Sequence, residues 1–301
     1  MTQNVRTAGL IHRLLKRVMI GLLVIIGGGA AAVFGLLYWQ AVKTTDQSGE
    51  YVALGSSFAA GIGLGQRAPD SPIQCFRTAG GYPTLVAKKT GMRLVDMSCS
   101  GSTTKHILSG GQLLLGPQLA AIGTATKLVT ITSGGNDVGY IGDLMVASGN
   151  MGQLGAWWHG DIEPADARPY DAVTVNLIKI IHSVRQKAPS AKILIINYPA
   201  IIPPNGRCAS LGISKQQADI SRDIAQQLAL ATKHAADEAG AQLIDIAKAS
   251  VGHDVCSKVP WVNGASVETG TAFHPNSAGA AATADAIVNT YSAIAANGSA
   301  L

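Results

Sequence analysis

The sequence predicts an α/β domain in which a parallel sheet of five strands is covered by helices on both faces. Short apolar runs rich in β-branched residues alternate along the chain with longer stretches of helical pattern. Such alternation is typical of strand–helix–strand units, whose parallel strands are buried on both faces. An uncharged apolar segment precedes this domain and predicts one transmembrane helix.

The first 48 residues have the pattern of a membrane anchor. Residues 18–39 contain no charged side chain, and a helix of that length spans a bilayer core of roughly 30 Å. The basic flank, Arg13 to Arg17, places residues 1–17 in the cytoplasm, and Tyr38–Trp39 suits the far interface. A cleaved signal peptide is the alternative, but no small-residue cleavage site follows at once. We expect a signal anchor, a polar linker at 40–48 and the folded domain at 49–301.

The charge composition argues against a nucleic-acid-binding protein. The formal net charge is +5, yet four of the 23 Lys and Arg residues lie before residue 40, which leaves 19 against 18 acidic residues. The folded domain is therefore nearly neutral and lacks the basic surface that nucleic-acid binding requires. The length allows one large domain or two small ones. The five expected strands indicate one, which we expect to be monomeric.

The strands and helices of the domain can be placed in order. The expected strands are Tyr51–Leu54, Arg93–Met97, Lys127–Thr132, Lys192–Asn197 and Ala241–Ile246. The expected helices are Tyr82–Thr90, Gln112–Ile122, Tyr170–Lys187, Ser214–Glu238 and about Ser277–Ala295. Ser214 is a candidate N-cap, and Gly240 lies just past the end of the same helix. Two long loops, Gly139–Arg168 with Trp157 and Trp158, and Pro199–Gly212, either shape a binding site or pack onto the domain.

Small polar residues follow three of the strands, and a histidine precedes the last helix. Gly55-Ser56-Ser57, Cys99-Ser100-Gly101 and Gly134-Gly135-Asn136-Asp137 come after the first three strands, and His274-Pro275-Asn276 comes later. Ligands of open α/β sheets bind outside the carboxyl ends of the strands. A serine, a histidine and amide donors gathered there are the parts that ester hydrolysis requires.

These four motifs, in this order, resemble the SGNH (GDSL-type) serine esterases and lipases, and in particular their actinobacterial extracellular branch. The resemblance covers about residues 49–296 and implies a flavodoxin-like three-layer α/β/α fold. Carried over by position, Ser57 would be the nucleophile and His274 the general base. The oxyanion hole would comprise the Ser57 and Gly101 N–H groups and the Asn136 side chain. No cofactor and no metal is implied.

Two positions depart from the family pattern. Ser56 stands where the first motif usually has aspartate. Thr271 stands three residues before the histidine, where many members have an aspartate that orients the imidazole. Some members of the extracellular branch use a backbone carbonyl instead, so we expect the Thr271 carbonyl to orient His274 in a Ser–His dyad. Glu268 is the nearest acidic residue in sequence.

All four cysteines lie beyond the anchor. An even number in an exported domain indicates two disulfides, and four cysteines allow three connectivities. The pairs Cys75–Cys99 and Cys208–Cys256 look like the disulfides of the extracellular branch.

The sequence therefore predicts a membrane-anchored, extracytoplasmic carboxylic ester hydrolase acting on acyl esters, lipids or acylated envelope glycans. Two alternatives remain open at this stage. One is a catalytically weak or inactive binding module for envelope glycan or lipid, motivated by Ser56 and Thr271. The other is an acyltransferase, in which a sugar hydroxyl replaces water.

Overall fold

The protein is represented by a computed structural model that describes residues 2–41, 45–69, 71–150 and 162–298. Trp157 and Trp158 of the first long loop lie outside the described residues. The helix α1 (Thr2–Ala41) and the α/β domain are separate compact units. Within α1, Leu15–Gln40 is long and apolar enough to cross a membrane, a test that an N-terminal signal sequence passes equally well.

The sheet is the predicted one. Its five strands are β1 (Tyr51–Gly55), β2 (Leu94–Asp96), β3 (Leu128–Thr132), β4 (Lys192–Ile196) and β5 (Gln242–Ile244). All pair in parallel in the order β2-β1-β3-β4-β5, with Tyr51 opposite Leu94 on one side and Leu128 on the other. This order is that of the flavodoxin-like doubly wound fold, and it places the carboxyl ends of β1 and β3 side by side.

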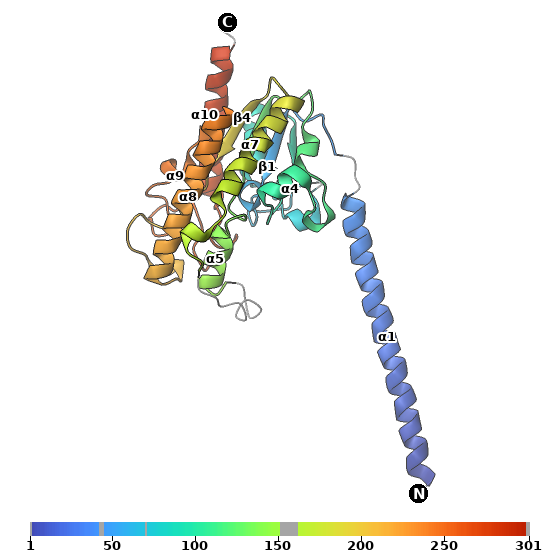
Figure 1. Cartoon of the computed structure of the whole chain (residues 1–301). Helices are drawn as coiled ribbons and strands as arrows, with labels where there is room; N and C mark the ends of the chain where they lie inside the picture. The colour runs from blue at the N-terminus through green and yellow to red at the C-terminus, as the bar shows by residue number, and fades with distance from the viewer. Residues whose placement is uncertain (1, 42–44, 70, 151–161, 299–301) are drawn as a thin grey trace. The chain divides into compact units, whose positions relative to one another are not determined.

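Helices cover both faces of the sheet (Figure 1). Alternate residues of each strand point to opposite faces. Val52 and Leu54 pack into the cluster that includes α7 (Tyr170–Lys187) and α8 (Lys215–Ala239). Tyr51 and Ala53 pack on the other face, where the cluster includes residues of α3 (Tyr82–Thr90) and α10 (Ser277–Gly298).

The longer helices begin and end as predicted. The Ser214 side chain caps α8 by accepting from the Gln217 N–H, and the Gln217 side chain accepts from the Ser214 N–H in return. Gly240, in the left-handed conformation, ends the same helix.

The expected helix Gln112–Ile122 is wrong. The structure has two 3₁₀ turns there, η2 (Gln112–Leu114) and η3 (Gln118–Ala121). Leu113 and Leu114 have positive φ, and Pro117 precedes η3, so a continuous helix cannot form.

Short helices also occupy segments for which no helix was predicted. They are α2 (Ser57–Ala60), α4 (Thr104–Ser109), α5 (Tyr140–Ala147) and α9 (Ile246–Ala249), with 3₁₀ turns η1 (Ile73–Cys75), η5 (Ala165–Ala167) and η6 (Ala209–Leu211). The Gly139–Arg168 connection is thus partly helical rather than a loop throughout.

Two disulfides link the loops of the domain. Cys75 is bonded to Cys99 and Cys208 to Cys256, which are the two pairs that the family resemblance implied. The first closes a loop of 24 residues and the second a loop of 48. Both constrain segments that follow the carboxyl ends of strands.

Candidate active site

Ser57 lies where β1 ends and α2 begins. Gly55 closes the strand at φ 148°, and a Cβ there would lie 2.4 Å from the Thr132 carbonyl oxygen of β3, so only glycine fits. The chain then turns at Ser56 into the single turn of α2. This tight turn holds the Ser57 side chain at the carboxyl end of the sheet, where it is almost fully buried.

His274 meets this serine from a distant part of the chain. Its Nε2 lies 2.8 Å from Ser57 Oγ, and its Nδ1 lies 2.8 Å from the Ala272 carbonyl oxygen. A carbonyl can only accept, so Nδ1 carries the proton and donates it to Ala272. Nε2 then keeps its lone pair and can accept the Ser57 hydroxyl proton, which is the arrangement that a general base requires.

The carbonyl that orients His274 is Ala272 and not Thr271 as we expected. The Thr271 oxygen already accepts from the His274 N–H at 3.3 Å and from Asn263 Nδ2 at 3.1 Å. Phe273 between them is fully buried with φ 56°, and this left-handed turn folds the Ala272 carbonyl back toward the ring. Glu268 is exposed, and no hydrogen bond or ion pair joins it to His274 among the described residues.

Burial sets the protonation of the histidine. Desolvation lowers the pKa of His274 to about 4, against a smaller opposing effect of the hydrogen bond to Ala272. The Phe58 ring, centred 5.0 Å from the imidazole, contributes to this apolar environment. The imidazole is therefore neutral at pH 7, in the form that can take a proton.

Gly101 and Asn136 lie in the loops that follow β2 and β3. Gly101 has φ 80°, and among the described residues neither its N–H nor the Ser57 N–H donates to a protein acceptor. One hydrogen of Asn136 Nδ2 bonds to the Ser102 carbonyl at 2.8 Å, which ties the two loops together and leaves the second hydrogen for another acceptor. Two unused backbone donors and one amide hydrogen are thus available for an oxyanion.

Ser56 is buried on the other side of the nucleophile turn. Its Oγ lies 3.1 Å from the Tyr198 hydroxyl, which also accepts the Gly135 N–H at 3.0 Å. Tyr198 thereby connects the Ser56–Ser57 turn to the glycine loop after β3. No sequence signal marked Tyr198, because an aromatic residue after a buried strand is most often part of the core.

Gln118 is a second supporting residue that sequence reasoning missed. Strand β2 pairs with β1 only as far as Ala53, so the Gly55 N–H has no backbone acceptor on that side among the described residues. The Gln118 side chain replaces it: Oε1 accepts the Gly55 N–H at 2.8 Å, and Nε2 donates to the Gly55 carbonyl at 3.0 Å and to Ser102 Oγ at 2.9 Å. One buried amide therefore fixes the end of β1 against the loop that carries Gly101.

The acidic residues near these loops are structural. Both Asp137 oxygens accept the Thr104 N–H, at 3.1 and 3.0 Å, at the start of α4. Asp245 accepts from Asn197 Nδ2 and from the Lys248 N–H. Both carboxylates therefore hold loops and helix starts in place.

Within the described part of the chain, no group of three or more His, Cys, Asp or Glu side chains could hold a metal ion. His106 caps α4 through the Thr103 N–H, and His253 stacks on Trp261. The site that the structure brings together is therefore a buried serine–histidine pair flanked by amide donors.

The chain is similar to known lipases and acylhydrolases over most of its length. Residues 53–282 match the GDSL-like Lipase/Acylhydrolase family. A lipase of Streptomyces rimosus is 31% identical over 235 residues, which cover 77% of this chain and 83% of that protein. Lipase 2 of Streptomyces coelicolor is 31% identical over 254 residues, covering 80% and 84%.

Solved structures of two Streptomyces lipolytic enzymes are also similar to the chain. The crystal structure of the extracellular lipase from Streptomyces rimosus superposes with a TM-score of 0.65 at 28% identity, covering 82% of this chain and 98% of that one. Phospholipase A1 from Streptomyces albidoflavus superposes with a TM-score of 0.65 at 26% identity, covering 81% and 98%.

Proposed function

The chain belongs to the GDSL-like lipase/acylhydrolase family, and from this we propose that it hydrolyses carboxylic acyl esters through a Ser57–His274 dyad. The observation that carries the proposal is the 2.8 Å hydrogen bond between Ser57 Oγ and His274 Nε2, with Nδ1 held by the Ala272 carbonyl. A carbonyl in place of the usual carboxylate fixes the tautomer and the ring without adding a negative charge.

The reaction proceeds in two halves. Ser57 Oγ attacks the ester carbonyl carbon while its proton passes to His274 Nε2, and the alcohol leaves with that proton to give an acyl-enzyme. His274 then takes a proton from water, which attacks the acyl carbon and releases the acid and free Ser57. The N–H groups of Ser57 and Gly101 and the Asn136 amide stabilise the oxyanion in each half.

The apolar segment Leu15–Gln40 supports a second part of the proposal, that the domain is tethered outside the cytoplasmic membrane. Arg13 precedes the segment, Lys16 and Arg17 lie at its start, and basic flanks remain on the cytoplasmic side. Two disulfides suit an oxidising, extracytoplasmic compartment. Lipid esters are the substrates that such a location supplies.

Membrane fractionation followed by protease treatment of whole cells tests this location. A soluble, shortened product would indicate signal cleavage.

A fluorophosphonate probe tests the catalytic part directly. The full chain should react, and mass spectrometry should locate the adduct on Ser57. Ser57→Ala should abolish both labelling and hydrolysis of p-nitrophenyl butyrate, while Ser56→Ala should retain the adduct. An adduct on Ser56, or no adduct on the folded chain, would overturn the assignment.

The same assays distinguish the ester hydrolase from the two alternatives, a binding module and an acyltransferase. A binding module without catalysis would bind lipid or glycan with no turnover between pH 6 and about 9, a range in which an imidazole base is active. An acyltransferase would form the Ser57 acyl-enzyme but pass the acyl group to a sugar hydroxyl, which product analysis with glycan acceptors would reveal.

A further inference from the structure

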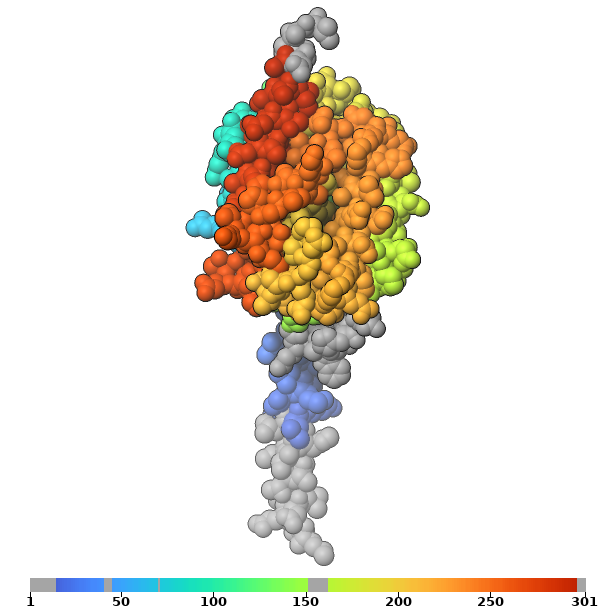
Figure 2. Space-filling model, turned by 90° about the vertical axis from the view of Figure 1, so that its left-hand side faces the viewer, coloured from blue at the N-terminus to red at the C-terminus, as the bar shows by residue number. Residues whose placement is uncertain are grey.

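A pocket of about 540 Å³ lies beside the candidate active site and has no role in the proposed reaction. It opens between α8, the segment that follows β4 and the short helix α9. Figure 2 shows this face of the molecule hollowed where the yellow and orange residues of these segments meet. Its volume falls in the range of about 300–1,000 Å³ that is typical of small-molecule sites.

The walls of the pocket are mostly aliphatic. Ala225, Ala229 and Leu230 line it from α8, and Ile201 and Ile202 line it from the segment after β4. At the mouth, Leu230 is 51% exposed and Val251 is 64% exposed. Two large apolar side chains open to solvent at the entrance of an apolar pocket favour an occupant that is itself a hydrocarbon chain.

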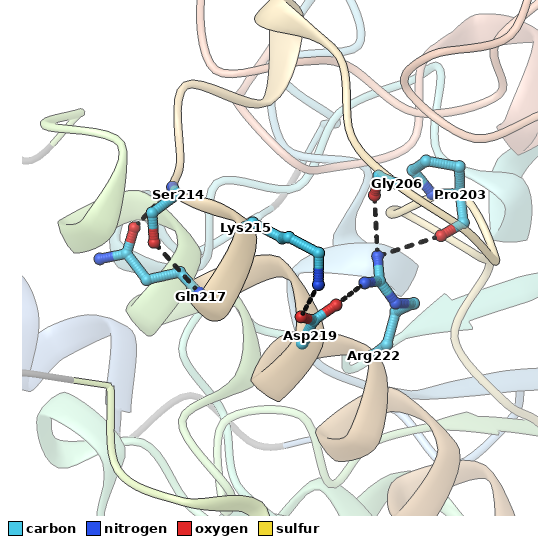
Figure 3. Close-up of polar contacts among 7 residues, drawn as sticks. All are labelled: Pro203, Gly206, Ser214, Lys215, Gln217, Asp219 and Arg222. Atoms are coloured by element: carbon cyan, nitrogen blue, oxygen red, sulfur yellow. Dashed lines mark hydrogen bonds and ion pairs between the residues drawn. The ribbon is translucent and has the colours of Figure 1, made fainter.

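The wall next to the mouth is held in place by Arg222. Its Nη1 donates to the Gly206 carbonyl at 3.0 Å and to the Pro203 carbonyl at 3.3 Å, and its Nη2 pairs with Asp219 (Figure 3). The loop after β4 is thereby fastened to α8, so the pocket is formed without a ligand. Three of the five N–H donors of Arg222 are thus engaged by the protein itself.

Two lysines remain at the rim. The Lys248 ammonium has no acidic partner within ion-pair distance in the described part of the chain, and Lys233 pairs with the exposed Asp237. Two acids also line the pocket: Asp245 accepts from Asn197 Nδ2 at 2.8 Å and from the Lys248 N–H at 3.1 Å, and Asp254 accepts the Cys256 N–H at 2.9 Å. The lining therefore holds three basic and two acidic side chains, and among the described residues Lys248 is the basic one of the three that forms no ion pair.

The pocket and the dyad share one wall but are distinct. Tyr198 lines the pocket, and its hydroxyl faces the other way, toward Ser56. Neither Ser57 nor His274 is among the described residues that line the cavity. An occupant of the pocket is thus separated from the reacting atoms by the Tyr198 ring.

We propose that this pocket binds a long-chain carboxylate, with the hydrocarbon chain between α8 and the Ile201–Ile202 segment and the carboxylate at Lys248. A single chain fits a cavity of this volume, and a carboxylate complements the unpaired ammonium of Lys248. The site does not depend on Ser57 chemistry, so it exists whether or not the chain is catalytically active.

Photo-crosslinking on the full chain tests the proposal. The chain is reconstituted in phosphatidylcholine vesicles with dodecanoic acid that carries a diazirine near its methyl end, irradiated and mapped by mass spectrometry. We expect adducts in Ala225–Lys233 and Ala247–Val251, at equal yield in the parent chain and in Ser57→Ala. Unlabelled dodecanoate should compete at least tenfold better than dodecanol.

Two variants and one control sharpen the result. Ala229→Phe fills the pocket and should lower the yield of these adducts at least fivefold. Lys248→Glu, at an exposed position that folding tolerates, should weaken competition by dodecanoate at least fivefold. Lys179→Glu makes the same charge change on the exposed face of α7 and should leave the labelling unchanged. Adducts only near Gly101 and His274, or equal competition by dodecanol, would overturn the proposal; loss of ester turnover alone would not affect it.

Discussion

The Tyr198 hydroxyl lies 3.1 Å from Ser56 Oγ and accepts the Gly135 N–H at 3.0 Å. One phenol thus connects the turn that presents Ser57 to the loop that presents Asn136. Ser56 occupies the position where the family usually has aspartate, and it is fully buried. The hydroxyl pair keeps the two loops together without burying a carboxylate, which avoids the desolvation of a charge.

Tyr198→Phe tests this connection. The change leaves the Gly135 N–H buried without its acceptor, a defect that typically costs about 1–3 kcal/mol. We expect kcat to fall about tenfold or more, since about 1.4 kcal/mol in the barrier corresponds to tenfold in rate. KM should change less, because no substrate contact is removed.

Tyr140→Phe is the matched control. Tyr140 is also buried, its ring lies 6.3 Å from that of Tyr198, and no hydrogen bond of its hydroxyl is present among the described residues. Steady-state kinetics of both variants should show a kcat effect for Tyr198→Phe alone. Equal effects would indicate a packing role for both rings.

A double-mutant cycle with Ser56→Ala and Tyr198→Phe tests whether the two hydroxyls act as a pair. Residues in direct contact typically show coupling energies of about 0.5–3 kcal/mol. The double variant should therefore lose less unfolding free energy than the two single losses added together. Chemical denaturation of the four chains measures this quantity, and strict additivity would contradict the pairing.

The elements that the sequence predicted well are those with strong local signals. Strands β1, β3 and β4 are buried apolar runs, and α8 has both a capping box and a C-terminal glycine. Local pattern is sufficient for such features. Ser57, Gly101, Asn136 and His274 were assigned from four short motifs that resemble those of a known family, and their catalytic roles stay a prediction.

The features that the sequence did not predict depend on contacts between distant segments. The Gln118 side chain forms its hydrogen bond with Gly55, which lies 63 positions earlier in the chain. The Tyr198 hydroxyl bonds with Ser56, which lies 142 positions earlier. The orienting carbonyl was placed at Thr271 rather than Ala272, because the left-handed turn at Phe273 has no glycine to signal it. A buried non-glycine residue takes such a conformation only when tertiary packing imposes it.

The pH dependence of hydrolysis follows from the burial of His274. The active form is the neutral imidazole, and burial lowers its pKa to about 4. As pH falls, the base therefore stays unprotonated below the ordinary range of histidine, and kcat/KM should decline only toward pH 4–5. A pH–rate profile of the full chain from pH 4 to 9 measures the acidic limb. A limb near pH 6.5, the unperturbed value, would show that the imidazole is solvated in the free enzyme.

Replacing Gln118 tests the support of the nucleophile strand. Gln118→Leu removes three hydrogen bonds to Gly55 and Ser102 in a site that is almost fully buried. The Gly55 N–H then has no acceptor, which should lower the free energy of unfolding by about 1–3 kcal/mol. Activity should fall with it, because the end of β1 is no longer fixed. Gln118→Glu keeps an acceptor for the N–H but repels the Gly55 carbonyl, so it should rescue neither property.

The two disulfides should affect stability alike and activity differently. In the chain-entropy account, opening a loop of 24 or 48 residues costs about 3.5 or 4 kcal/mol of stability. The Cys99 N–H donates to the Gly55 carbonyl at 3.0 Å, and Ser100 follows directly, so the first bridge also positions the loop that carries Gly101. Cys208 and Cys256 have no such contact with the dyad residues.

Thermal unfolding and p-nitrophenyl butyrate assays of the paired serine variants separate the effects. Cys75→Ser/Cys99→Ser should lower both the Tm and kcat, and Cys208→Ser/Cys256→Ser should lower the Tm while kcat at 25 °C changes less than threefold. An equal loss of kcat in both would mean that each bridge supports the site only through global stability.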